Sequence, residues 1–347
     1  MREAVSKTNH EKFFEDLPVG ETIEHATPRT ITEGDVALYR ALCGARFVLQ
    51  ASDEFARKVG LPCAPVDDLL TFNAVLGMSE PDFPDNGSAE LAVNHVCFGA
   101  TVYPGDTLAA VSTVTGTALG PADNFGTVHI DTEGVNQDGE AVVRFSRQLL
   151  VARREPARPG NEEGQPGVPS RVDAGQMSLP YGLRVKEWSY SQAGAPHRWG
   201  DYEPGETIDH VHGAAVDGPA SRLAGRLLGN LRPRCEGAHA IPGGYVLSLA
   251  RSLSYHGLEN TLAVLAINDA KYLSGVRDGD TLYASTKVLE RFTLPDIEKV
   301  AALRLCTTGM NCAPSVCAAT GDDKGDDKGE AGPGVVLKID YVAAVPV

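Results

Sequence analysis

The chain has 347 residues, of which 42% are hydrophobic and 22% are charged, as is usual for a folded protein with room for two domains. Its formal net charge at neutral pH is −15, and the sequence contains no basic stripe. That charge argues against nucleic acid and anionic membrane surfaces as partners. No apolar run approaches the roughly 18 residues of a membrane span, and the first residues lack the apolar core of a signal peptide, so we expect a cytoplasmic protein.

Seven cysteines form an odd set without paired C-x-x-C spacing. This pattern favours reduced thiols over a zinc site or a disulfide framework. Cys312 and Cys317 lie close together in the sequence, but no second pair and no histidine cluster accompanies them. We therefore interpret both as small core or loop residues.

Two motifs occur twice along the chain, once in each half. The pattern D-x-x-x-G-E-T-I-[ED]-H ends at His25 and again at His210. Further along, the pattern G-D-T-L begins at Gly105 and at Gly279, and an alternating apolar run follows each copy. Because the two histidines occupy equivalent positions, we predict that both have a structural role.

Between these motifs each half has one helical pattern, at Pro65–Met78 in the first half and at Pro242–Leu253 in the second. Strand-like runs follow each G-D-T-L motif, at residues 126–133, 141–152, 300–308 and 335–344. Asn136–Gly139 predicts a hairpin turn between the first two of these runs. A long helix followed by a meandering antiparallel sheet, twice over, predicts an α+β fold in which each sheet wraps its own helix. The two sheets are expected to join edge to edge, which removes exposed strand edges.

The predicted domain organisation follows this repeat. Residues 1–152 form the first repeat and residues 181–347 the second. Residues 153–180 are rich in Pro, Gly and Glu and have few large apolar residues, so we predict a flexible linker there. Residues 320–333, with their G-D-D-K repeat, predict a solvated loop to which we assign no role.

The strongest candidate for function lies within residues 229–253, where a polar loop leads through Pro-Gly-Gly into an apolar helix. Pro242 can occupy a first-turn position without losing a hydrogen bond, and Gly243 and Gly244 have no β-carbon to keep a ligand from the backbone. Free N–H groups at a helix N-terminus suit a developing oxyanion such as a thioester enolate. The alternative is an ordinary buried helix with a glycine-containing entry turn.

Four segments resemble the MaoC-like acyl-CoA hydratases, namely FFEDLPVGETIEHATPRTITEGDVALYRAL, SDEFARKVGLPCAPVDDLL, HRWGDYEPGETIDHV and GGYVLSLARSLSYHGLEN. The resemblance extends from about Phe13 to Val345 apart from the linker and the acidic loop. It implies a tandem (double) hot-dog fold and reversible hydration of mesaconyl-CoA (2-methylfumaryl-CoA) to β-methylmalyl-CoA, without a metal or redox cofactor. It also implies an acyl-CoA thioester as substrate and a homodimer as assembly.

MaoC-like hydratases use an Asp and a His about five residues apart, just before the segment that leads to the helix. In the first half the resemblance places Gly44 and Leu49 at these positions, so that half cannot perform the acid–base chemistry. Asp67 and Asp68 at the start of its helix would also compete for the N-terminal donors. We therefore expect the first half to be a scaffold or a pocket for the acyl-CoA tail.

In the second half, the resemblance places Asn230 at the acid position and Cys235 at the histidine position. His239 is four residues further on, in a half that is shorter before its G-D-T-L motif. The hypothesis is that His239 is the general acid and base, that Asn230 orients the water, and that the N–H groups of Gly243 and Gly244 bind the thioester oxygen.

Cys235 is a rival for the acid–base role, since the adjacent Arg232 and Arg234 would lower the pKa of its thiol. The alternative is that Cys235 is a small loop residue without a catalytic role. The two arginines are either solvated charges or a grip for a carboxylate of the acyl group or a CoA phosphate. Two other functions stay open: an acyl-CoA-binding hot-dog protein that has lost catalysis, and an enoyl-CoA hydratase of shifted substrate range.

Overall fold

The structure, a computed structural model, describes residues 12–83, 89–120, 122–155, 169–229, 241–295, 297, 299–312 and 334–347. The first half contains η1 (Phe14–Asp16), β1 (Thr22–Thr30), α1 (Glu33–Cys43), α2 (Val48–Ala51), α3 (Asp53–Lys58), α4 (Asp68–Ser79), η2 (Glu80–Asp82), β2 (Ala89–Phe98), β3 (Thr107–Leu119), β4 (Phe125–Val135) and β5 (Ala141–Ala152). The connection and second half contain η3 (Ala174–Gln176), η4 (Val185–Glu187), α5 (Tyr190–Ala193), η5 (Trp199–Asp201), β6 (Thr207–Ala215), α6 (Gly218–Leu228), α7 (Gly243–Leu253), β7 (Ala263–Tyr272), β8 (Thr281–Thr293), β9 (Val300–Met310) and β10 (Val335–Pro346).

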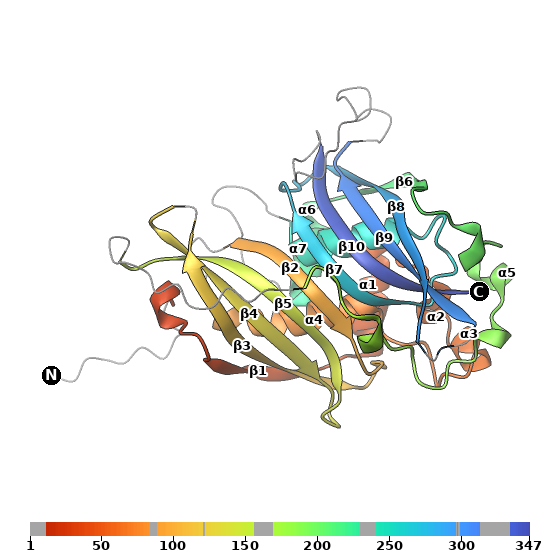
Figure 1. The fold of residues 1–347 in the computed structure, drawn as a ribbon, viewed down its shortest axis with the longest axis horizontal. Coiled ribbons are helices and arrows are strands. Elements are labelled where there is room, and N and C mark those ends of the chain that lie inside the picture. The colour runs from red at the N-terminus through yellow and green to blue at the C-terminus, as the bar shows by residue number, and fades with distance from the viewer. Residues whose placement is uncertain are drawn as a thin grey trace.

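The strands of the described segments form one sheet in the order β1-β3-β4-β5-β2-β7-β10-β9-β8-β6, and every pairing in it is antiparallel (Figure 1). The second half repeats the strand order of the first half in reverse, as a pseudo-twofold axis between β2 and β7 requires. At this junction Val93 pairs with Ala270 and Val96 with Ile267. The two repeats therefore join edge to edge, as the sequence predicts.

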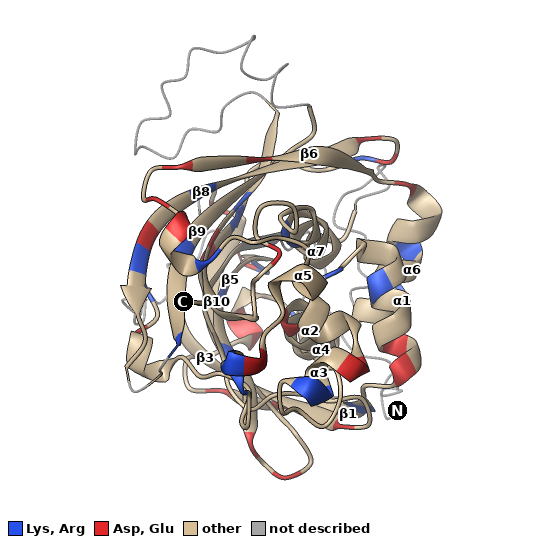
Figure 2. Cartoon of the chain, turned by 90° about the vertical axis from the view of Figure 1, so that its right-hand side faces the viewer, with Lys and Arg blue, Asp and Glu red and all other residues tan. Residues whose placement is uncertain are grey.

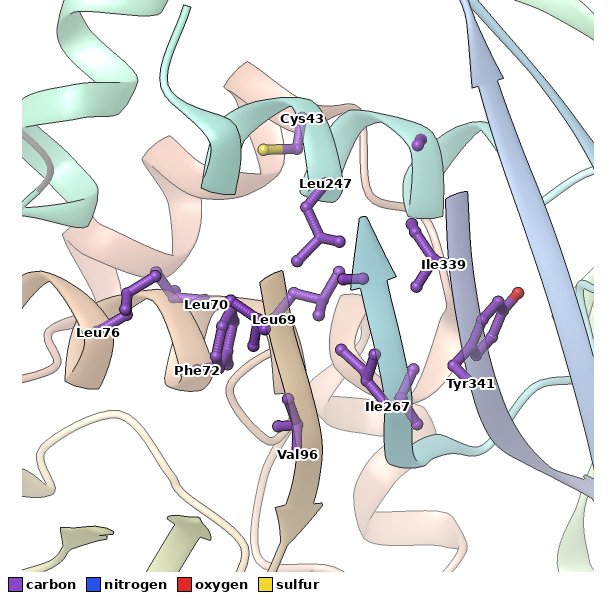
Figure 3. Packing of buried hydrophobic residues seen from close by; sticks show 14 of the residues in the cluster. Cys43, Leu69, Leu70, Phe72, Leu76, Val96, Leu247, Ile267, Ile339 and Tyr341 are labelled. Carbon is purple, nitrogen blue, oxygen red and sulfur yellow. The ribbon is translucent and has the colours of Figure 1, made fainter. Parts of the chain in front are cut away.

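The curved sheet wraps around α4 and α7, and α1 and α6 cover these two helices on the side away from the sheet (Figure 2). The core between the layers is continuous across the two halves. Figure 3 shows Phe72 of α4 and Leu247 of α7 pointing toward Val96 of β2 and Ile267 of β7. Each repeat is thus a long helix wrapped by its own five strands, which confirms the predicted double hot-dog fold.

The predicted elements are present with small shifts at their ends. The two helical patterns are α4 and α7, which begin at Asp68 and Gly243 because the residues before them have non-helical backbone angles. The four strand-like runs are β4, β5, β9 and β10. In the predicted hairpin turn, Gly139 has a φ of +77° and its N–H donates to the carbonyl oxygen of Asn136 at 3.1 Å.

The two repeated histidines hold equivalent strands together. His25 in β1 lies 2.8 Å from Ser112 Oγ of β3, and its other ring nitrogen lies 2.7 Å from Asp82. His210 in β6 lies 2.7 Å from Thr286 Oγ1 of β8, and its Nδ1 donates to the carbonyl oxygen of His256 at 2.7 Å. Both imidazoles are buried, so the predicted structural role of His25 and His210 is confirmed.

Residues 169–180 belong to the predicted flexible linker, yet the structure packs them against the sheet. Val172 and Met177 are buried among apolar residues of both halves. The N–H of Val172 donates to Asn268 Oδ1 of β7 at 2.9 Å. This part of the connection is held in place because these two apolar side chains are buried against the sheet.

The cysteine prediction needs one correction, because Cys312 is disulfide-bonded. Sequence spacing does not show which thiols the fold brings within bonding distance. The other described cysteines carry free thiols; they are Cys43, Cys63, Cys97 and Cys306.

Among the described segments, no helix combines the length and the apolar character that crossing a membrane requires.

Candidate active site at the start of the second central helix

The N-terminus of α7 offers backbone donors in a buried setting. Pro242 precedes the helix with φ −56° and ψ 130°, and no side chain caps it. The first N–H group with a described acceptor is that of Tyr245, which donates to the carbonyl oxygen of Pro242 at 3.0 Å. No acceptor in the described part of the chain bonds to the N–H groups of Gly243 and Gly244, and every residue from Gly243 to Ser252 is buried. These donors lie at the positive end of the helix dipole.

Close packing leaves no room for a β-carbon at Gly244 and little room for one at Gly243. A β-carbon at Gly244 would lie 2.0 Å from Oδ1 of Asn73, and one at Gly243 would lie 3.0 Å from the ring of Tyr272. The two glycines therefore let the start of α7 approach α4 and β7 closely.

Asn73 of α4 fixes the start of α7. Its Nδ2 donates to the carbonyl oxygen of Leu69 at 2.7 Å and to Ser248 Oγ at 3.2 Å. Ser248 in turn donates to the carbonyl oxygen of Gly244 at 2.8 Å. Both side chains are buried, so this network holds α4 and the first turns of α7 together.

Sequence reasoning missed Asn73 and Tyr272. The available signal for Asn73 is a polar residue in the apolar sequence of α4, matched by Ser248 at the equivalent place in α7. Tyr272 lies seven residues before the second G-D-T-L motif, as Phe98 lies seven residues before the first. An aromatic residue at the same place in both repeats is the signal for Tyr272.

The first half presents a different helix start. Asp67 caps α4, and its Oδ1 accepts from the N–H of Leu69 at 2.9 Å. A carboxylate thus accepts from the N-terminal N–H groups of α4, as the sequence predicts, whereas the equivalent groups of α7 have no acceptor among the described residues. Gly44 ends α1 with a φ of +70°, and Leu49 is fully buried.

The structure therefore describes part of the predicted site. Gly243 and Gly244 lie together at the helix start, as expected. The other predicted residues lie outside the described residues; they are Asn230, Arg232, Arg234, Cys235 and His239. Within the described segments, no group of three or more His, Cys, Asp or Glu side chains is arranged to hold a metal ion.

Comparison with known proteins shows which family and which solved structures this chain resembles. Residues 14–135 match the family model described as MaoC like domain. A protein of Mycobacterium tuberculosis described as having a double hotdog fold superimposes with a TM-score of 0.73 at 20% identity, covering 96% of this chain and 98% of that one. The chain is thus a double hot-dog protein that contains a MaoC-like domain.

Relatives that match over their full length show the particular family within this class. The chain is 39% identical to beta-methylmalyl-CoA dehydratase of Chloroflexus aurantiacus and 41% identical to mesaconyl-CoA hydratase of Cereibacter sphaeroides, in each case over 98% of this chain and 99% of the relative. A crystal structure of a MaoC domain protein from Chloroflexus aurantiacus superimposes with a TM-score of 0.92 at 39% identity, covering 99% of both chains. The chain belongs to the mesaconyl-CoA hydratase (β-methylmalyl-CoA dehydratase) family.

Proposed function

We propose that the chain is a hydro-lyase that catalyses the reversible hydration of mesaconyl-CoA to β-methylmalyl-CoA in the metabolism of four- and five-carbon dicarboxylic acids. The observation that carries this proposal is the pair of N–H groups at Gly243 and Gly244, which have no acceptor among the described residues. They lie at a buried helix start in a chain whose full-length relatives are named for this reaction. A thioester carbonyl is the group that such donors activate.

The reaction needs a base, an acid and an oxyanion site. Water adds its oxygen to the β-carbon, and the electrons of the C=C bond move through the α-carbon onto the thioester oxygen. Hydrogen bonds from Gly243 and Gly244 stabilise the resulting enolate. His239 takes a proton from the attacking water and returns one to the α-carbon, which restores the thioester. Removal of water reverses these steps.

The remaining residues of the predicted site take supporting roles in this proposal. Asn230 orients the water, and Cys235 is the alternative acid–base group. Arg232 and Arg234 hold the distal carboxylate of the acyl group or a CoA phosphate, because guanidinium groups form paired hydrogen bonds with such anions. We also place the enzyme in the cytoplasm as a homodimer, with no nucleic-acid or membrane partner.

The test is the loss of enoyl-thioester absorbance when the purified protein meets mesaconyl-CoA, with crotonyl-CoA in a parallel reaction. We expect rapid hydration of mesaconyl-CoA only. His239→Ala is expected to lower kcat by at least about 100-fold, the usual contribution of a general acid–base group, whereas Cys235→Ser stays within a few fold of the parent. Activity of His239→Ala close to that of the parent would remove the role of His239, and loss in Cys235→Ser would transfer it to the thiol.

A second candidate function is acyl-CoA binding without catalysis. It is favoured by the cysteine at the position where MaoC-like hydratases have histidine. Saturable binding of mesaconyl-CoA without turnover of either substrate would establish it. Turnover of crotonyl-CoA alone would instead indicate a hydratase of shifted substrate range.

A further inference from the structure

The first half contains a cavity at the place equivalent to the start of α7. This cavity has a volume of about 30 Å³, and both Asp68, the first residue of α4, and Phe98 line it. Their counterparts in the second half are Gly243, the first residue of α7, and Tyr272, which packs against it. A carboxylate therefore borders this cavity at the position where the second half has Gly243.

Oxygen atoms gather at this cavity. Gln50 is 9% exposed, and its Nε2 donates to the carbonyl oxygen of Leu262 at 3.2 Å. Its carbonyl oxygen, Oε1, is buried and has no partner among the described residues. Asp68 accepts from the N–H of Val264 at 2.8 Å, and Thr71 lines the same space. A buried amide oxygen without a donor costs free energy unless a ligand or water satisfies it.

The charge at the cavity is negative. Asp67 precedes Asp68, and burial together with the charge of Asp67 raises the pKa of Asp68 to about 7. Arg251 of α7 is the cation that acts on both carboxyl groups, but its Nη1 donates to Ser254 and its guanidinium stacks 3.8 Å from the centre of the Phe47 ring. On α1, Tyr39 donates to Asp67 at 3.3 Å. Among the described residues, no cation therefore forms an ion pair with Asp68.

We infer that this cavity is a binding site for one small monovalent cation, of potassium or ammonium size, held by the Asp68 carboxylate and the Gln50 amide oxygen. Hard cations of this kind take oxygen ligands. The cavity volume of about 30 Å³ holds one such ion, since a single water already needs at least about 10–15 Å³. Mg²⁺ is disfavoured, because it keeps several of its waters and the cavity volume of about 30 Å³ has no room for them.

The bound cation would link the two halves. Gln50 and Asp68 belong to the first half, whereas their partners belong to the second half, Leu262 directly before β7 and Val264 within it. A cation on these two side chains therefore stabilises the folded arrangement of this segment. Because ligand binding to the native state raises stability by mass action, the site is detectable in unfolding experiments. The inference does not depend on the proposed hydratase activity.

The experiment compares thermal unfolding of the full chain in potassium, ammonium and choline chloride at one ionic strength of about 0.1 M and about pH 8, where Asp68 is mostly ionised. Choline is too large for the cavity. We expect midpoints about 2–4 °C higher in potassium or ammonium than in choline. Asp68→Asn, which keeps an acceptor for the Val264 N–H but loses the charge, is expected to abolish this difference.

Glu24→Gln is the matched control, because Glu24 is an exposed carboxylate of β1 away from the cavity, and it should keep the difference. Equal midpoints of the parent in all three salts would overturn the inference and leave water or a proton in the cavity. A difference that survives in Asp68→Asn would overturn it as well. Should that variant fail to fold, thallium(I) NMR of the parent decides, since a bound thallium signal displaced by potassium is expected and its absence contradicts the site.

Discussion

At the scale of single residues, Gly244 is the position where packing and the proposed chemistry meet. A β-carbon there would lie 2.0 Å from Asn73 Oδ1, so Gly244→Ala must displace Asn73 or the start of α7. We expect a loss of about 1–3 kcal/mol in the free energy of unfolding, as for other overpacked sites, together with slower hydration. Urea unfolding and the hydration assay measure the two effects.

Gly200→Ala is a suitable control for this prediction, because a β-carbon at Gly200 meets no atom within 4 Å. The double variant Gly244→Ala with Asn73→Ala should be less destabilised than the sum of the two single variants, since removing the Asn73 amide relieves the overlap. Additive losses would show that the contact between Gly244 and Asn73 is not what limits this position.

Residues of the candidate site could be predicted where neighbouring residues in the sequence form a recognisable pattern. Gly243 and Gly244 follow from the Pro-Gly-Gly sequence before an apolar helix. Asn73 did not, because its role arises from a bond to Ser248 that spans 175 residues of sequence. Gln50 is similar, since its partner Leu262 is 212 residues away. The periodicity of the sequence indicates that such residues are buried, but it does not indicate which distant residue each one contacts.

At the scale of elements, His210 connects β6 to β8 and makes stability depend on pH. Burial lowers the pKa of His210 from 6.5 to about 4, so the folded state prefers the neutral ring. Between these two pH values the unfolded chain binds the proton and the folded chain does not, and stability is lost as pH falls. The shift corresponds to about 3 kcal/mol when the pH reaches 4.

The variant His210→Asn tests this contribution. Asn can still donate to the carbonyl oxygen of His256 but no longer titrates. We expect lower stability than the parent at neutral pH, where the bond to Thr286 is lost, and a smaller decrease between about pH 6.5 and 4. Urea unfolding across this range measures the slope, with the exposed His212→Asn as control. A parent-like slope in His210→Asn would mean that other groups cause the acid sensitivity.

Some strands could be predicted from the sequence and others could not, for a physical reason. The runs that became β4, β5, β9 and β10 follow the repeated G-D-T-L motif and end in turn residues. No strand was expected at β2 or β7, although these two strands form the junction of the halves. The first six residues of β7 are all buried, and the first five, AVLAI, are apolar; periodicity cannot distinguish such a short apolar run from a buried helix.

At the scale of the whole molecule, the duplicated motifs predicted the paired repeats and their edge-to-edge junction. They did not show how far the halves depend on each other. The main core cluster contains α4 and β2 residues together with α7 and β7 residues, and the Asn73–Ser248 bond connects the two central helices. The two repeats are thus distinct in sequence but share one core, because the pseudo-twofold axis passes through the middle of that core.

This shared core predicts that neither half is stable alone. Expression of residues 1–152 would expose the edge of β2 and the apolar side of α4, which invites aggregation or pairing with a second copy. We expect an insoluble or dimeric product, and recovery of a soluble complex when residues 153–347 are co-expressed. Size-exclusion chromatography and circular dichroism distinguish these outcomes. A monomeric first half with cooperative unfolding would show that its own five strands and α4 suffice, and that the junction at β2 and β7 adds contacts without being required for folding.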